Sequence, residues 1–157
     1  MEDDDMTLRN PRVDGVRLFV SGLDDSLSVE SMMGLVVDCC GRGGDRPNGI
    51  IVRPTAGDHR WAPADLDRIV AAVIPHLEAG EKVNVHCRSG RSRSTTAAAA
   101  VLLAMGHAKT LEEAVHLCAL DSYIDGVGKA PDRRCMASLR EWWHGRKQAP
   151  LFSTHRA

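Results

Sequence analysis

The chain lacks the features that would place it in a membrane or on a disulfide scaffold. Its longest apolar run, residues 97–105, falls far short of the roughly 18 apolar residues of a membrane-spanning helix. Its five cysteines are an odd number without framework spacing, and the adjacent Cys39 and Cys40 cannot form a CxxC pair. No Cys/His spacing resembles a zinc site, nothing else in the sequence argues for a metal, and no cofactor is expected.

Neither positive nor negative charge predominates in the chain. Twenty basic and 21 acidic side chains leave a formal net charge of -1, so any attraction to anions must be local. The N-terminal sequence MEDDDM is acidic, unlike a secretory or transit peptide, and we expect a cytoplasmic protein. The length of 157 residues suits one domain, predicted at 15–145 between flexible tails at 1–14 and 146–157.

Apolar runs and helical spacing predict an α/β domain in which helices cover a sheet. The strands are expected at 16–20, 34–40, 50–53 and 82–87. The helices are expected at 63–79, 94–105, 110–120 and from 131 onward. Pro75 is expected to kink or shorten the first of these helices.

The most informative stretch is VNVHCRSGRSRST, residues 83–95. A cysteine ends a predicted strand, and a loop of Arg, Ser and Gly leads into a predicted helix. Backbone N–H groups of such a loop and of the helix N-terminus can converge on one anion, such as a phosphate. Gly90 permits close approach of the backbone, and Arg93 supplies a planar fork for two oxygens. The same positive field would stabilise the thiolate of Cys87 as a nucleophile. The alternative, a core cysteine beside a solvated loop, does not account for this combination.

HCRSGRSRS resembles the His-Cys-x5-Arg-Ser/Thr signature of the cysteine-dependent protein tyrosine phosphatase superfamily. The short chain and the segments DSYIDGVGKAPD and PDRRCMASLREWW are similar to its dual-specificity branch. The resemblance covers roughly residues 15–143. It implies a single domain with a central, mostly parallel sheet of about four or five strands and helices on both faces.

The resemblance also implies roles for the residues of the signature. Cys87 would take the phosphoryl group as a cysteinyl-phosphate intermediate, and Arg93 would clamp the phosphate. Ser94 would hydrogen-bond the sulfur and help it leave, while His86 would orient the loop and favour the ionised cysteine. The phosphate-binding loop would comprise Arg88, Ser89, Gly90, Arg91, Ser92 and Arg93, and the family needs no metal.

The general acid of this branch is an Asp on a loop before the helix that precedes the signature strand. Asp58, in TAGDHRW, matches that loop. A purely turn-forming Asp is the alternative, because Asp is common after Gly. Asp65 and Asp67 are rivals, but they fall in the first turns of the predicted helix, where acids complement the dipole.

The substrate stays open between several classes. Short loops predict a shallow cleft and a dual-specificity protein phosphatase acting on phosphotyrosine and on phosphoserine or phosphothreonine. Arg88 and Arg91 also resemble basic positions of phospholipid and phosphoinositide phosphatases, and an RNA 5′-phosphate is a further alternative. From another class, the chain could be an inactive module that binds phosphoproteins. Cys39 or Cys40 is a candidate redox partner of Cys87.

Overall fold

Four parallel strands form one sheet in the computed structural model, which describes residues 7–119 and 131–147. The order across the sheet is β1-β4-β2-β3. The strands are β1 (Leu18–Ser21), β2 (Leu35–Asp38), β3 (Gly49–Ile51) and β4 (Val83–His86). In the ladder, His86 pairs with both Ser21 and Asp38, so the carboxyl ends of the three strands meet at one edge. Ligands of open parallel sheets bind at this kind of edge.

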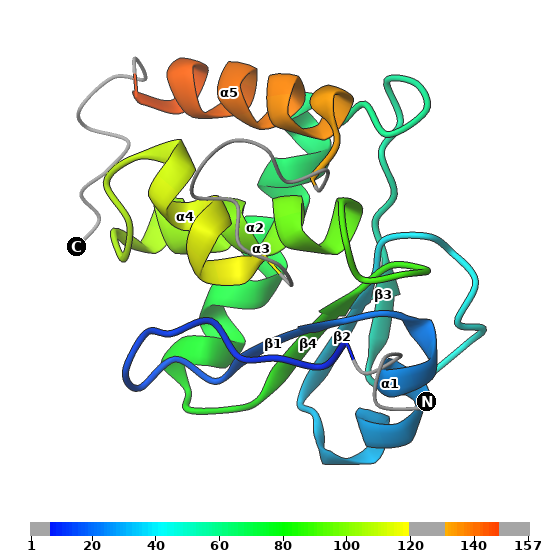
Figure 1. The fold of residues 1–157 in the computed structure, drawn as a ribbon. Helices are drawn as coiled ribbons and strands as arrows, with labels where there is room; N and C mark the ends of the chain where they lie inside the picture. The colour runs from blue at the N-terminus through cyan, green and yellow to red at the C-terminus, as the bar shows by residue number, and fades with distance from the viewer. Residues whose placement is uncertain (1–6, 120–130, 148–157) are drawn as a thin grey trace.

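Helices cover both faces of the sheet. Every residue of β2 and β4 is buried, and because successive side chains point to opposite faces, both faces must be covered. Figure 1 shows one thick layer above the sheet and a smaller helix on the other side. The thick layer contains α2 (Pro63–Glu78), α3 (Arg93–Met105), α4 (Leu111–Cys118) and α5 (Arg133–Lys147). The smaller helix is α1 (Leu23–Val29), followed by the 3₁₀ turn η2 (Glu30–Met32). The predicted fold class is confirmed.

Helix α3 is the centre of the thick layer. It contacts β1 and β4 as well as α2, α4 and α5. Residues 97–100 are four consecutive alanines, all fully buried. Their small side chains let neighbouring elements pack against every side of α3, which fixes its N-terminus at the carboxyl edge of the sheet.

Several details differ from the sequence prediction. Helix α2 continues through the exposed Pro75 for three more residues and ends at Glu78, one residue before the predicted boundary; the predicted kink stays a prediction. Helix α5 extends to Lys147, beyond the predicted boundary at 145. Helix α1 and η2 were not predicted. No helix among the described residues has the length and apolar character needed to span a bilayer.

The first described residues are held against the domain, although they fall in the segment predicted as a flexible tail. Thr7 and Leu8 donate their backbone N–H groups to the Asp25 carboxylate, at 2.7 and 3.0 Å. Arg9 forms an antiparallel bridge with Val20 of β1. These contacts attach residues 7–9 to the domain, and the predicted domain boundaries stay predictions.

Candidate active site

The signature loop connects β4 to α3 and surrounds a buried thiol. Cys87 directly follows β4 and is 1% exposed. Its Sγ lies 3.3 Å from the Ser94 hydroxyl and 3.4 Å from the Ser94 backbone nitrogen, in the first turn of α3. The sulfur therefore sits at the positive end of the helix dipole, next to two groups that can donate to a thiolate.

A pair of glycines lets the signature loop pass close to the end of β1. Gly90 has a φ of +76°, and a Cβ there would lie 2.5 Å from the Gly22 nitrogen and 2.6 Å from the Ser21 carbonyl carbon. A Cβ on Gly22 would in turn meet the Arg88 carbonyl oxygen at 2.9 Å. The Leu23 amide donates to that carbonyl at 3.1 Å. Both positions therefore require glycine, since each side chain would push two backbones apart.

Arg93 begins α3 and contributes to a cavity of about 350 Å³. Its Nε is buried and has no hydrogen-bond partner among the described residues. Ser92 precedes it at the N-cap but does not cap the helix with its hydroxyl, which instead accepts a hydrogen bond from the Asp132 amide at 3.0 Å. The start of α3 thus presents uncapped amides and a guanidinium, the donor set that suits an oxyanion.

Arg9 anchors the signature loop from the N-terminal segment. Its guanidinium donates to the Gly90 carbonyl at 2.7 Å and to the Thr95 hydroxyl at 2.9 Å, and its Nε donates to the Cys118 carbonyl at 2.9 Å. One side chain therefore ties the signature loop to α3 and to the end of α4. The Gly90 carbonyl is turned toward Arg9.

His86 is held by a second arginine on the other side of the loop. Arg46 donates to His86 Nε2 at 2.9 Å and to the Ser26 hydroxyl at 2.9 Å, and it lies 3.2 Å from the Glu30 carboxylate. Because a guanidinium only donates, Nε2 must be the acceptor and Nδ1 must carry the ring proton. Nδ1 faces the Cys87 carbonyl at 3.4 Å. Burial and the Arg46 charge lower the pKa of His86 against the opposing effect of Asp38, so the ring is neutral.

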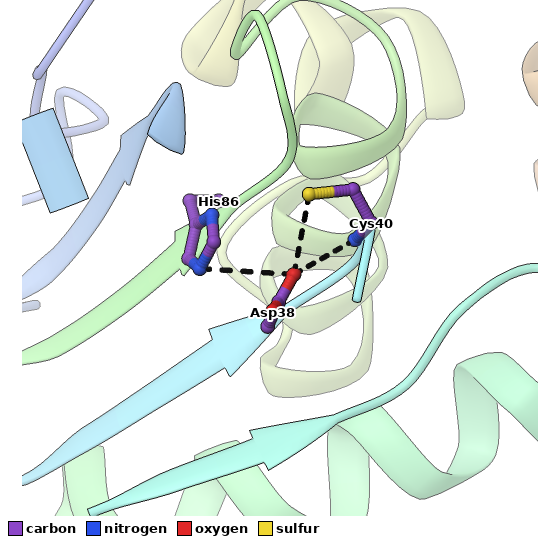
Figure 2. A group of neighbouring side chains, drawn as sticks. All are labelled: Asp38, Cys40 and His86. Atoms are coloured by element: carbon purple, nitrogen blue, oxygen red, sulfur yellow. Dashed lines mark hydrogen bonds and ion pairs between the residues drawn. The ribbon is translucent and has the colours of Figure 1, made fainter. Parts of the chain in front are cut away.

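Asp38, Cys40 and His86 form a cluster behind the loop (Figure 2). Such side chains could ligate a metal, but each is engaged by the protein. The Asp38 carboxylate accepts hydrogen bonds from the amides of Cys40, Gly41 and Gly43 at 2.7–2.9 Å and from the Cys40 thiol at 3.3 Å. Burial raises the pKa of Asp38, but the hydrogen bonds from the Gly43, Cys40 and Gly41 amides lower it overall. The cluster therefore organises the turn after β2.

The cavity beside Arg93 is lined by the loop that contains Asp58. Its other lining residues include Cys40, Arg53, Thr55 and His59. The Asp58 carboxylate is largely exposed and lies 3.1 Å from the Arg134 guanidinium. The structure therefore places Asp58 and Arg93 on one cavity.

The two rival aspartates have structural partners instead. Asp65 is buried and accepts from the Ala62 and Thr55 amides at 2.8 and 2.9 Å, which caps α2. Asp67 accepts from the Trp142 indole at 2.8 Å and so links α2 to α5. Neither contributes to the cavity that contains Arg93.

Several solved structures are similar to this fold, among them a phosphatase domain. The structure of human DUSP28 superposes with a TM-score of 0.66 at 19% identity, covering 91% of this chain and 95% of that one. The Yvh1 phosphatase domain from Chaetomium thermophilum superposes with a TM-score of 0.64 at 22% identity, covering 91% of this chain and 99% of that one. PTPMT1 in complex with PI(5)P superposes with a TM-score of 0.62 at 18% identity, covering 87% of this chain and 95% of that one. The chain has the dual-specificity phosphatase fold. No family model and no curated protein sequence matches it.

Three side chains of the signature loop are exposed, whereas the two cysteines after β2 are buried. Arg88, Ser89 and Arg91 are exposed. Cys39 and Cys40 are buried, and burial is the main cause that raises the pKa of each. Cys40 also lines the cavity beside Arg93, but its redox role stays a prediction.

Sequence reasoning missed the residues that support this fold's signature loop from a distance. Arg9 lies in a segment predicted as a tail, and Arg46 lies in a Gly-rich segment predicted only as a loop. His59 and Asp132 contact each other across 73 positions of sequence. A charged residue inside a Gly-rich loop was the available signal for Arg46, but nothing local indicates its partner.

Proposed function

We propose that the chain is a cysteine-dependent phosphomonoester hydrolase. The observation that carries the proposal is the position of the Cys87 sulfur at the N-terminus of α3, 3.4 Å from the Ser94 amide, in the loop that ends with Arg93. A core cysteine needs no such surroundings. A nucleophile that attacks a phosphate dianion needs both a stabilised thiolate and nearby donors for the oxygens.

In the first step, the Cys87 thiolate attacks phosphorus in line with the leaving oxygen. The backbone amides of residues 88–93 and the Arg93 guanidinium hold the other three oxygens as charge develops on them. Asp58 protonates the leaving oxygen as the P–O bond breaks. The product is a cysteinyl-phosphate and a free alcohol or phenol.

In the second step, water attacks the cysteinyl-phosphate. Asp58, now ionised, accepts a proton from this water, and the S–P bond breaks to release inorganic phosphate. Ser94 donates its hydroxyl hydrogen to the departing thiolate, in agreement with the 3.3 Å contact between its oxygen and the sulfur. His86 acts through the loop backbone, because its Nδ1 faces the Cys87 carbonyl and not the sulfur.

The substrate class that we favour is phosphoprotein, with phosphotyrosine and phosphoserine or phosphothreonine all accepted. The cavity beside Arg93 is bordered by the exposed loop that contains Asp58. The short loops favour a shallow cleft, which would admit short and long phosphorylated side chains. A phosphoinositide or another phospholipid is the second candidate. PTPMT1 was solved with PI(5)P, and the exposed Arg88 and Arg91 here offer positive charge for further anionic groups.

Turnover of an aryl phosphate by wild type, Cys87→Ser and Asp58→Asn tests the proposal. We expect no turnover by Cys87→Ser and a loss of about 10²–10⁴-fold for Asp58→Asn. Phosphopeptides, phosphoinositide vesicles and a 5′-phosphorylated RNA then compare the substrate classes. Activity retained by Cys87→Ser would exclude the mechanism. Phosphopeptide binding without turnover by wild type would instead favour an inactive binding module.

A further inference from the structure

His59, next to the proposed acid, adopts an unusual backbone conformation. Its φ is +58°, and it is the only residue other than glycine with a positive φ in the described part of the chain. The tight turn around it requires this conformation, since the Arg60 amide donates to the Gly57 carbonyl and the Ala56 amide to the Arg60 carbonyl, both at 3.0 Å. Glycine or asparagine would meet the same requirement with less strain. The backbone therefore does not explain why a histidine occupies this position.

The His59 side chain has a specific partner on a distant element. Its Nδ1 is in hydrogen-bond contact with the Asp132 carboxylate, just before α5. Burial raises the pKa of Asp132, but hydrogen bonds from the Cys135 amide and from His59 lower it overall. The carboxylate is therefore ionised and can only accept, so His59 donates from Nδ1.

Asp132 also contacts the signature loop. Its backbone amide donates to the Ser92 hydroxyl at 3.0 Å, one residue before Arg93. Its other carboxylate oxygen accepts from the Cys135 amide at 2.9 Å, which fixes Asp132 at the start of α5. A continuous set of contacts thus runs from the turn at 56–60 through Asp132 to the loop around the Cys87 sulfur.

The contacts of Asp58 itself cannot hold that turn. Its side chain is 81% exposed, and among the described residues its carboxylate pairs with the exposed Arg134 guanidinium at 3.1 Å. Exposed ion pairs contribute little to fixing a side chain. His59 is the more buried of the two neighbours, with 29% of its side chain exposed.

We propose that His59 is a positioning residue whose contact with Asp132 holds the Asp58 turn against the signature loop. The inference rests on the proposed function, in which Asp58 protonates the leaving oxygen. His59 itself transfers no proton to the substrate. Loss of the His59 side chain should therefore slow the reaction only when the leaving group needs a proton, and it should leave the affinity for phosphate unchanged.

His59→Gly removes the side chain at a positive φ that glycine adopts without strain, so it avoids a backbone clash that would itself affect folding. We expect its Tm to stay within about 3 °C of wild type. For phenyl phosphate, whose leaving group needs a proton, we expect kcat to fall about 10- to 100-fold with little change in KM. For dinitrophenyl phosphate, the leaving group departs without a proton. The rate at which this substrate phosphorylates the enzyme in single-turnover measurements should therefore change less than about 2-fold.

The same selective loss should appear in Asp132→Asn, which can keep its hydrogen bond to the Cys135 amide. The double variant should lose no more activity toward phenyl phosphate than either single variant, since both substitutions break the same contact. His76→Gln is the matched control. It breaks another histidine–carboxylate contact, with Glu81 at 2.6 Å, roughly 20 Å along α2 from the turn, and should leave both substrates unaffected.

Unchanged turnover of phenyl phosphate by His59→Gly would overturn the proposal. Equal losses with the two substrates would also overturn it, because they would indicate general damage to the site. If wild type hydrolyses neither substrate, the proposed function fails, and hydrogen exchange still tests the contact. Amides of Ala56 and Arg60 should exchange faster in His59→Gly than in wild type; unchanged exchange would show that Asp132 does not hold the turn.

Discussion

Replacing Arg46 by methionine should destabilise the protein and release the ring of His86. The Arg46 side chain is only 4% exposed, and His86 and Ser26, to which it donates, are fully buried. Its removal leaves His86 Nε2 and the Ser26 hydroxyl without their donor, at about 1–3 kcal/mol for each buried group. Methionine recovers part of this cost, because it packs in the same space and removes a buried charge. We therefore expect a loss of about 3 kcal/mol.

For a domain of this size, a loss of about 3 kcal/mol lowers Tm by roughly 6–12 °C. Thermal or urea unfolding measures the change, with Arg68→Met as the control because Arg68 is exposed on α2. Nitrogen NMR should find wild-type His86 protonated at Nδ1 and a mixture of tautomers in Arg46→Met. A variant as stable as the control, or a wild-type ring protonated at Nε2, would refute the assignment of Arg46 as the donor to His86.

Three further changes probe the support of the signature loop. Gly90→Ala should abolish turnover and lower Tm, because its Cβ would lie 2.5 Å from the Gly22 nitrogen; activity near wild type would contradict the packing. Arg9→Met should lower Tm and reduce kcat/KM by about 10-fold through the freed Gly90 carbonyl, whereas the exposed Arg12→Met should do neither. Since the pKa of His86 is lowered from 6.5, the unfolded state binds more protons as pH falls below 6.5, and the protein loses stability there. His86→Gln should lose less folding stability than wild type between pH 7 and about pH 5. If both proteins lost the same stability over this range, His86 would not be the cause.

The sequence was sufficient for the parts of the site that are contiguous in the chain. The signature residues 86–94 lie between a strand and a helix whose apolar patterns are clear, so the position of Cys87 at a helix N-terminus followed directly. The loop of Asp58 was predicted from its place before α2, and the structure brings it to the cavity that contains Arg93. Its role as the acid stays a prediction.

Helix α1 could not be predicted for a physical reason. It has seven residues, only Ser26 among them is buried, and no side chain caps its N-terminus. Such a short segment shows no helical repeat of apolar residues, and its conformation depends on contacts with the rest of the domain. Its Asp25 carboxylate, which binds the Thr7 and Leu8 amides, is one such contact.

The supporting contacts of the site escaped prediction because they join distant positions. Arg46 and His86 are 40 residues apart, and Arg9 and Gly90 are 81 apart. Each pair forms only when the sheet brings the carboxyl ends of its strands to one edge. No local pattern encodes such a pair, so the sequence predicted the chemistry of the loop but not the side chains that hold it.

The central claim, that the Cys87 sulfur takes the phosphoryl group, is tested most directly by intact mass measurement of the quenched enzyme. Asp58→Asn mixed with dinitrophenyl phosphate should accumulate the intermediate, because this leaving group needs no acid whereas the hydrolysis step still needs a base. We predict a mass increase of one phosphoryl group, mapped to Cys87 and absent from Asp58→Asn carrying Cys87→Ser. An adduct on another residue, or phosphate release that persists without Cys87, would contradict the account.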